Sequence, residues 1–128
     1  MAKWVNADVL DLGINEIKTD ANSMRLLSAY TAGDSYATVN AASIAAAAMT
    51  SGDYTLGNGA SSARTLTTAA KSATASAGSG GAPNLHIAFV DTATSRVLWV
   101  TDETTDQVVT SGNTVNFPAL VYTASQPT

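Results

Sequence analysis

The chain has 128 residues, one histidine, no cysteine and a formal net charge of −4 at pH 7. This length is sufficient for one hydrophobic core, and the absence of cysteine excludes disulfides, thiol nucleophiles and thiolate metal sites. The acidic balance and the scattered Lys and Arg residues argue against nucleic acid as a partner, because such binding requires clustered positive charge.

Charged residues make up only 12% of the chain, whereas Ala, Ser, Thr and Gly are abundant. Ordinary domains carry about 25% charged residues, so this composition indicates that part of the surface lies against other subunits. The chain begins with acidic residues where a secretory signal needs an apolar run, and no stretch is long and apolar enough to span a membrane. We therefore expect a protein that is made and assembled in the cytoplasm, with no membrane partner.

An N-terminal arm (residues 1–5) precedes a predicted helix over about 6–18. Asn6 can cap this helix, because an Asn side chain accepts hydrogen bonds from the first free backbone amides. One face of the helix carries apolar residues at helical spacing: Val9, Leu10, Gly13, Ile14 and Ile17. The arm contains Trp4, an aromatic residue that either packs against the start of the helix or contacts a neighbouring subunit.

The next segments alternate between extended and helical patterns. The sequence MRLLSA predicts a short strand with Met24 and Leu26 on one face. One helical turn is expected after Ser35, followed by an extended segment from about Ser43.

The middle of the chain predicts two strands and a loop. The sequence SGDYTLGNG predicts a strand between two turns, in which Gly57 and Gly59 are available for positive φ. The Thr-rich residues 63–77 predict one long strand. The glycine-rich residues 78–83 predict a flexible loop within the domain.

Residues 84–91 and 96–102 predict a β-hairpin around a four-residue turn. In its first strand, alternate residues point to opposite faces: Leu85, Ile87 and Phe89 to one, and His86, Ala88 and Val90 to the other. Because both faces are apolar or small, we expect this strand to be covered on both sides.

The C-terminal region predicts a second hairpin, in which residues 106–110 pair with residues 114–124 across a turn at 111–113. Pro118 indicates an edge position or a bulge, because proline cannot donate to a ladder. The whole chain (1–128) is therefore predicted to be mainly β, a single-domain antiparallel β-sandwich or barrel-like fold with one N-terminal α-helix.

Nothing in the sequence predicts an enzyme. His86 is the one histidine, and its place in a half-apolar strand favours a structural role over that of a general base. No G-x-S-x-G motif occurs, and the glycine-rich loop lacks the Lys-Ser or Lys-Thr pair of a phosphate-binding loop. We predict no catalytic residues and no cofactor.

Acidic residues gather in the sequence DETTD, which places Asp102, Glu103 and Asp106 between two predicted strands. Oxygen-rich loops of this kind can bind calcium. The spacing lacks the order of an EF-hand, which favours a solvated turn, and metal binding by this loop stays open.

Two further carboxylate pairs, Asp8 with Asp11 and Glu16 with Asp20, lie at helical spacing. A solvated helix face explains both pairs without a general acid.

Aromatic residues support a different class of protein. Trp4, Trp99 and the four tyrosines could form a platform for sugar rings, as in a carbohydrate-binding module. Trp99 lies on the patterned face of the predicted hairpin, however, where a core position is the more common one.

Five stretches follow one another over most of the chain: ADVLDLGINEIKTDA, GDYTLGNG, RTLTTAAKS, NLHIAFVDTATSRVLWVT and VVTSGNTVNFPALVY. Their order resembles a family of small virion structural proteins of tailed bacteriophages. That family is recognised by an LD..LN.IK..A helix, a GD[FY]T..NGD..GRK.TVAA block, an H.AL.D...S.LL.VT hairpin and an LTSGNTV..P strand. This chain departs from the pattern at Ala60, where an acidic residue is usual, at Ala63, where glycine is usual, and at residues 120–122, which replace an acidic ending.

The resemblance implies a capsid decoration, or cement, protein that is made in the host cytoplasm, binds the assembled shell in the virion and stabilises it. The implied partners are the major capsid protein and further copies of the chain, as a dimer or trimer. We predict Trp4, Val5 and Tyr54 as interface residues. A tail or fibre component is the first alternative, a carbohydrate-binding module the second and an enzyme the third; the resemblance implies no catalytic residues.

Overall fold

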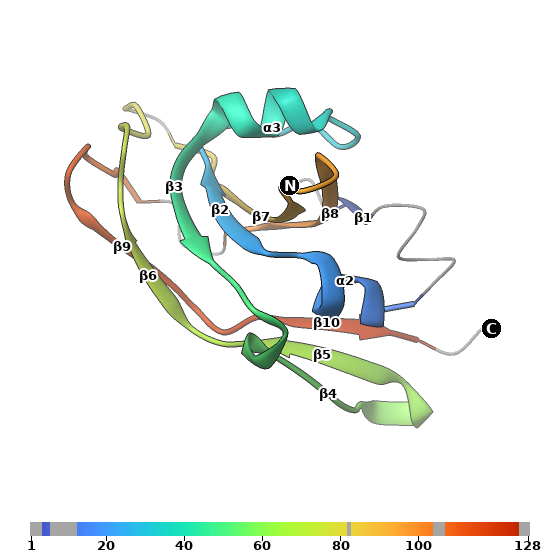
Figure 1. Cartoon of the computed structure of the whole chain (residues 1–128). Coiled ribbons are helices and arrows are strands. Elements are labelled where there is room, and N and C mark those ends of the chain that lie inside the picture. The colour runs from blue at the N-terminus through green and yellow to red at the C-terminus, as the bar shows by residue number, and fades with distance from the viewer. Residues whose placement is uncertain (1–3, 6–12, 82, 104–106, 126–128) are drawn as a thin grey trace.

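The computed structural model describes residues 4–5, 13–81, 83–103 and 107–125, and antiparallel strands dominate it (Figure 1). One layer is a five-stranded sheet with the order β1-β8-β7-β2-β3. Its strands are β1 (Trp4–Val5), β2 (Ser23–Leu27), β3 (Ser43–Ala48), β7 (His86–Asp91) and β8 (Arg96–Asp102). The predicted mainly β, antiparallel class is confirmed, as is the hairpin of β7 and β8.

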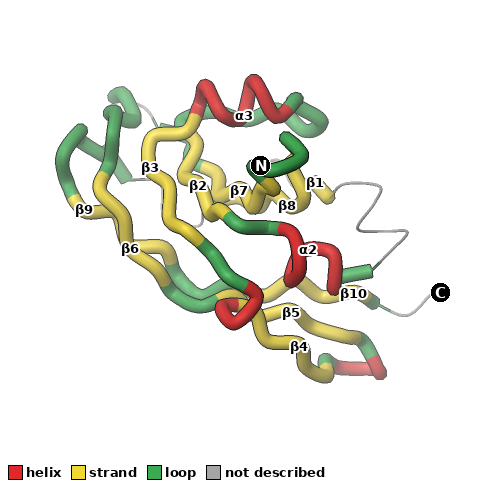
Figure 2. The backbone as a smooth tube through the Cα atoms, in the orientation of Figure 1, coloured by secondary structure: helices red, strands yellow, loops and turns green. Residues whose placement is uncertain are grey.

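The second layer consists of two smaller sheets, with the orders β10-β5-β4 and β6-β9. Its strands are β4 (Tyr54–Asn58), β5 (Arg64–Thr68), β6 (Lys71–Thr74), β9 (Thr114–Phe117) and β10 (Val121–Ala124). The two sheets share one register, because Thr67 pairs with Val121, the Thr68 amide donates to the Leu120 carbonyl, and Lys71 pairs with Phe117. β5–β6 and β9–β10 therefore form one bent antiparallel pair (Figure 2).

The predicted long strand over 63–77 is thus divided into β5 and β6. The break lies opposite Pro118, which separates β9 from β10 and has no N–H to donate to the ladder. The predicted edge position of Pro118 is confirmed, since within the described chain neither β9 nor β10 has a second neighbouring strand.

The predicted second hairpin is wrong. Residues 107–110 form no strand, and β9 pairs with β6. The main chain of Val109 instead bonds Ser79 of the glycine-rich loop. The Val109 N–H donates to Ser79 Oγ at 2.7 Å, and the Val109 carbonyl accepts from the Ser79 N–H at 2.9 Å. The predicted turn at 111–113 is present, with Gly112 at φ 90°, and the predicted second arm at 114–124 forms β9 and β10.

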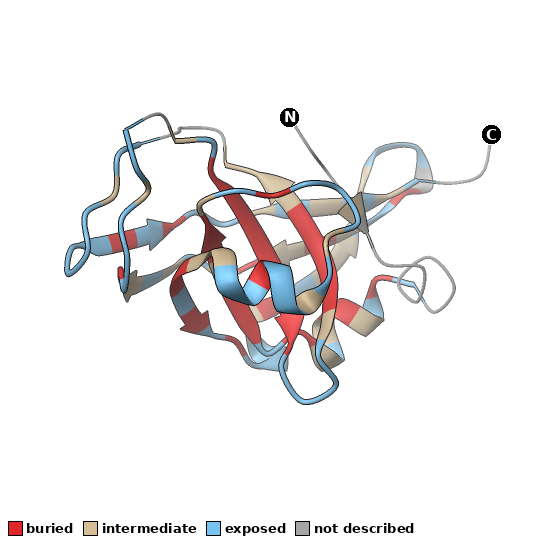
Figure 3. Ribbon diagram, turned by 90° about the horizontal axis from the view of Figure 1, so that it is seen from above, coloured by how far each residue is buried: buried red, intermediate tan, exposed pale blue. Residues whose placement is uncertain are grey.

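The core lies on both faces of β7, whose six residues are all buried. Leu85, Ile87 and Phe89 belong to the inner cluster between the two layers. Ala88 and Val90 belong to the outer cluster, which α3 (Tyr36–Ala42) covers (Figure 3). The predicted alternation of this strand is confirmed, and its two apolar faces explain why the sheet is covered on both sides.

Both helices differ from their predicted extents. α2 spans Asn15–Asp20, and Gly13, with φ 82°, cannot belong to a helix that runs through it; residues 6–12 of the predicted helix lie outside the described residues. α3 begins after Ser35 as predicted, where Ser35 Oγ accepts from the Thr38 N–H at 3.2 Å, and β3 follows from Ser43. Two short 3₁₀ turns, η1 (Ser51–Asp53) and η2 (Ala60–Ser62), flank β4. Among the described residues, no helix has the length and apolar character needed to cross a membrane.

The glycines around β4 serve close packing rather than positive φ, which corrects the prediction for Gly57 and Gly59. A Cβ on Gly57 would lie 3.2 Å from Thr65 Oγ1, and a Cβ on Gly59 would lie 3.0 Å from Thr65 Cγ2. Because glycine has no Cβ, β4 can approach β5 closely at this end of the β4–β5 pair.

Docking of α2 onto the inner cluster is testable through Ile17, which is fully buried, whereas Asn15 on the same helix is exposed. We expect Ile17→Ala to lower the free energy of unfolding by about 2–5 kcal/mol, because it leaves a cavity in the core. Asn15→Ala should change it by less than about 0.5 kcal/mol. Urea unfolding of both variants measures the difference, and equal values would show that α2 is not docked as described.

Candidate functional site

Arg96, the first residue of β8, contacts three carboxylates. Its Nη2 lies 2.9 Å from Glu16 Oε1, 3.0 Å from Asp20 Oδ2 and 3.4 Å from Asp91 Oδ2. Glu16 and Asp20 stand one turn apart on α2, so the guanidinium ties this helix to the β7–β8 turn. The solvated helix face predicted for these two carboxylates is therefore wrong.

Asp91 also shapes the hairpin turn. Its Oδ2 accepts from Thr94 Oγ1 at 2.7 Å, and its Oδ1 accepts from the Ala93 N–H at 2.9 Å. Burial raises the pKa of Asp91, but the hydrogen bonds from Thr94 and Ala93 and from Arg96 outweigh it and hold the pKa below 3.8. A carboxylate kept ionised in this way is unsuited to act as a general acid.

Two lysines connect α2 and β6 to η1 and the start of β4. Lys18 Nζ donates to the carbonyls of Ser51 and Tyr54 at 2.9 and 2.8 Å. Lys71 Nζ lies 2.9 Å from Asp53 Oδ1, and this hydrogen bond is the largest of several causes that lower the pKa of Asp53. These charges connect α2, η1 and β6.

His86 is buried in β7 beside Tyr30, with 5.6 Å between the ring centroids. Its Nδ1 lies 3.2 Å from the Asn84 carbonyl, and its Nε2 lies 3.5 Å from Asp102 Oδ1. A carbonyl only accepts, so the Nδ1 carries the proton and donates to Asn84. The neighbours of the two ring nitrogens are thus a carbonyl and a carboxylate, and neither is a hydroxyl nucleophile. This arrangement fits a structural role for His86.

The acidic sequence DETTD does not form a cluster in the described residues. Asp102 ends β8 and faces His86, the Glu103 N–H donates to the Leu85 carbonyl at 3.0 Å, and Asp106 lies outside the described residues. Within the ranges that the structure describes, no three His, Cys, Asp or Glu residues come together as a possible metal site.

Four aromatic rings cross the molecule from one layer to the other. Phe89 stacks on Trp99, with centroids 4.7 Å apart and an interplanar angle of 12°. Tyr54 meets Phe89 edge-on at 6.2 Å, and Tyr122 meets Trp99 edge-on at 5.4 Å. The predicted core position of Trp99 is confirmed, because the residue is only 6% exposed and belongs to the inner cluster.

A β-bulge explains how Trp99 reaches the inner cluster. Phe89 pairs with Trp99 and Val90 with Val97, which leaves Leu98 without a residue opposite. The consecutive residues Leu98 and Trp99 both join the inner cluster, although strict alternation would send them to opposite faces.

The three predicted interface residues occupy different environments. Tyr54 is only 1% exposed, and its hydroxyl donates to the Ala21 carbonyl at 2.8 Å, so it has no surface for a partner and its assignment to an interface is corrected. Trp4 and Val5 form β1, where they pair with Val100 and Trp99. The half-buried Trp4 packs on the outer cluster, and its contact with a partner stays a prediction.

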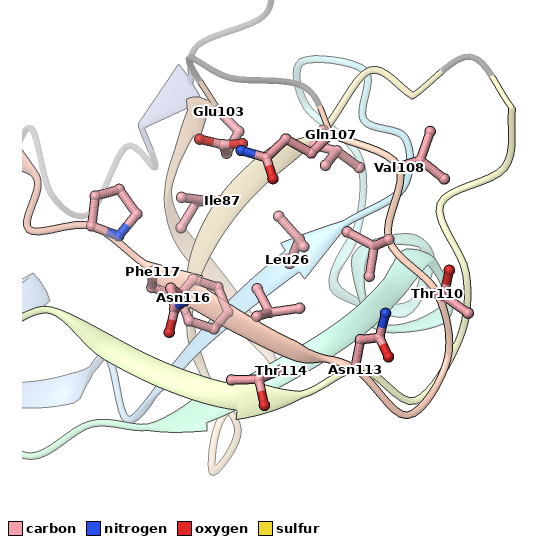
Figure 4. A pocket seen from close by; sticks show the side chains of 14 residues that line it. Leu26, Ile87, Glu103, Gln107, Val108, Thr110, Asn113, Thr114, Asn116 and Phe117 are labelled. Atoms are coloured by element: carbon pink, nitrogen blue, oxygen red, sulfur yellow. The ribbon is translucent and has the colours of Figure 1, made fainter.

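Two pockets lie along β9 and β10. The first has a volume of about 550 Å³, with the aliphatic side chains of Leu26, Leu85 and Ile87 as its floor. Figure 4 shows Leu26 and Ile87 between the segment that carries Val108 and the strand that carries Asn116. The second pocket, of about 480 Å³, lies between β1, β8 and β10 and is lined by Trp4, Trp99, Val100, Thr101, Val121, Tyr122 and Thr123.

No family model, curated protein or solved structure matches the chain. The sequence analysis missed both the Arg96 network and the two pockets. Arg96 and Glu16 lie far apart in the sequence, and local spacing carries no signal of such a contact. The pockets likewise combine residues far apart in the sequence, such as Leu26 with Phe117 and Trp4 with Tyr122.

The hydroxyl of Tyr54 is expected to stabilise the fold by satisfying the buried Ala21 carbonyl at the end of α2. Tyr54→Phe should lower the free energy of unfolding by about 1–3 kcal/mol, since it leaves that carbonyl without a partner. Tyr36→Phe is the matched control, because no hydrogen bond of the Tyr36 hydroxyl occurs in the described chain. Urea unfolding measures both variants, and an equal loss of unfolding free energy in Tyr54→Phe and Tyr36→Phe would contradict the Tyr54–Ala21 hydrogen bond.

The lowered pKa values of Asp53 and Asp91 predict acid sensitivity. A carboxylate with a depressed folded-state pKa contributes stability above its unfolded pKa and loses it as the pH falls through the folded value. The free energy of unfolding should therefore decline from about pH 5 to about pH 2. Asp91→Asn should be less stable at neutral pH yet decline less over the same window. Urea unfolding at several pH values measures both curves, and parallel curves would refute the assignment.

Proposed function

We propose that the chain is a structural protein of a tailed-bacteriophage virion, a capsid decoration protein that binds the assembled shell. The support is the ordered resemblance of its five sequence blocks to that family. The major capsid protein is the proposed partner, and the virion the proposed location.

The observation that carries this proposal is that charged residues of separate blocks contact one another. Lys18 of the first block binds the carbonyl of Tyr54 in the second. Asp53 of the second pairs with Lys71 of the third. Glu16 of the first pairs with Arg96 of the fourth. The blocks are thus explained as parts of one scaffold, and no reaction is needed to account for their polar residues.

The remaining surface fits binding rather than catalysis. Many of the ionisable side chains are engaged between α2, β4, β6 and the β7–β8 turn, and Glu103 is the one Asp, Glu, Lys, Arg or His residue among those that line the first pocket. A protein that binds only the assembled shell stabilises that state by mass action, with a gain that grows with its free concentration. This is how a small domain without chemistry of its own can protect a capsid.

The proposal is tested with purified protein, capsids of the encoding phage that lack it, and isolated tails. We expect saturable co-sedimentation with the capsids and a higher temperature of capsid disruption, because binding favours the assembled state. Binding to tails alone would replace the decoration role by a tail or fibre role.

Two variants sharpen this test. Trp4→Ala should weaken attachment by at least about 1–2 kcal/mol if the arm contacts the shell. Arg96→Gln, which alters only the internal network, should bind like the parent at temperatures where circular dichroism shows it folded. Equal occupancy for Trp4→Ala and parent would remove the arm from the binding surface.

A further inference from the structure

The ribbon of β9 and β10 is an open edge of the second layer. β9 pairs only with β6, and β10 only with β5, within the described chain. In an antiparallel pair, alternate residues direct both main-chain groups toward the partner strand, and the residues between them direct theirs away. Each strand of the ribbon therefore presents free donors and acceptors along its outer side.

The strand register identifies these free groups. The Ala75 N–H donates to the Asn113 carbonyl, so Val115 and Phe117 also face β6, and the main chains of Thr114 and Asn116 point away from it. In β10, the Thr68 N–H donates to the Leu120 carbonyl. By the same alternation, Tyr122 faces β5, whereas Val121 and Thr123 point outward.

This edge lacks the usual protection against pairing. Exposed edge strands normally carry charged residues that prevent another strand from adding to them. From residue 107 to the end of the chain, no Asp, Glu, Lys or Arg occurs. Pro118 interrupts the edge at one position only.

One exposed apolar side chain lies on this edge, and another lies across the first pocket from it. Val108 is 67% exposed and Val121 57% exposed, and no other large hydrophobic residue of the described chain is exposed. Val108 lines the first pocket and Val121 the second. An apolar border beside free main-chain groups is what an added β-strand would cover.

We propose that this edge is a self-association surface, at which two copies of the chain pair antiparallel through β9 and β10 about a two-fold axis near residues 118–119. Thr114 then lies opposite the partner's Thr123, and Asn116 lies opposite the partner's Val121. All four main chains point outward, so each can exchange hydrogen bonds across the axis.

The register itself favours a second copy over an unrelated strand. Outward residues recur every second position in a regular strand, but Asn116 and Val121 lie an odd number of positions apart across the break at 118–119, so a regular strand cannot match both. An antiparallel second copy carries the same break at the same place, so the edge is complementary to itself, as a two-fold contact requires. Pro118, which has no N–H, falls at the axis between the two sets of hydrogen bonds. Two copies with a net charge of −4 each also meet here without opposing like charges.

Sedimentation equilibrium over a range of concentrations, combined with amide hydrogen exchange, tests the proposal without any phage component. We expect a dimer, and slow exchange of the Thr114 and Asn116 amides that becomes fast on dilution. A monomer at all concentrations would overturn the proposal. It would be overturned equally if these amides became protected only on a capsid, because another protein's strand would then occupy the edge.

A charge pair tests the axis. Ala119 is exposed, and Ala119→Lys brings two positive charges together across the axis. It should raise the dimer dissociation constant at least about tenfold, as should Ala119→Asp, while an equimolar mixture of the two variants should restore the dimer. Thr55→Lys, on the exposed opposite edge of the same layer, is the matched control and should leave the dimer unchanged. A dimer that only Thr55→Lys disrupts, or a mixture that stays monomeric, would contradict the proposed axis.

Discussion

Strand β7 sets the constraint on which the rest of the structure depends. All six of its residues are buried, so both faces of the central sheet must be covered. On one face of the sheet, the second layer covers Ile87 and Phe89. On the other face, α3 covers the cluster that contains Ala88 and Val90. The aromatic row of Tyr54, Phe89, Trp99 and Tyr122 then fixes where the two layers meet. Hydrophobic burial of this kind is the main favourable term in folding, and here it is organised around one hairpin.

The few charged residues complete this arrangement. Arg96 anchors α2 against the β7–β8 turn, and Lys18 and the Asp53–Lys71 pair hold η1 and β4 under the same helix. Partly exposed ion pairs contribute little individually, but these fix the positions of elements that lie far apart in the sequence. The charges thus serve the scaffold, and the charge-free β9–β10 edge is left as the surface that can act on a partner.

Local features of the fold were predictable, whereas its long-range pairing was not. Alternation in β7 identified both of its faces, and Ser35 marked the start of α3, because these signals depend on neighbours in sequence. β9 pairs with β6, which lies far earlier in the sequence, and Val109 bonds Ser79 across 30 positions. No spacing rule contains information on such distant contacts. Tyr54 was predicted as an interface residue, yet it is buried, and its hydroxyl donates to the Ala21 carbonyl at the end of α2. An amphipathic side chain of this kind fits either environment, and the sequence alone does not distinguish them. Composition indicated a surface that lies against other subunits, whereas the edge proposed for self-association could be identified only from the strand register.

Native-state hydrogen exchange tests the central role of β7 most directly. The account predicts that the amides of Ile87, Ala88 and Phe89 exchange only through global unfolding, with a free energy equal to that from urea unfolding, while those of β4 and β10 open at lower cost. If the β7 amides exchanged through a local opening while β4 or β10 stayed protected, the hairpin would not be the element around which the molecule is organised.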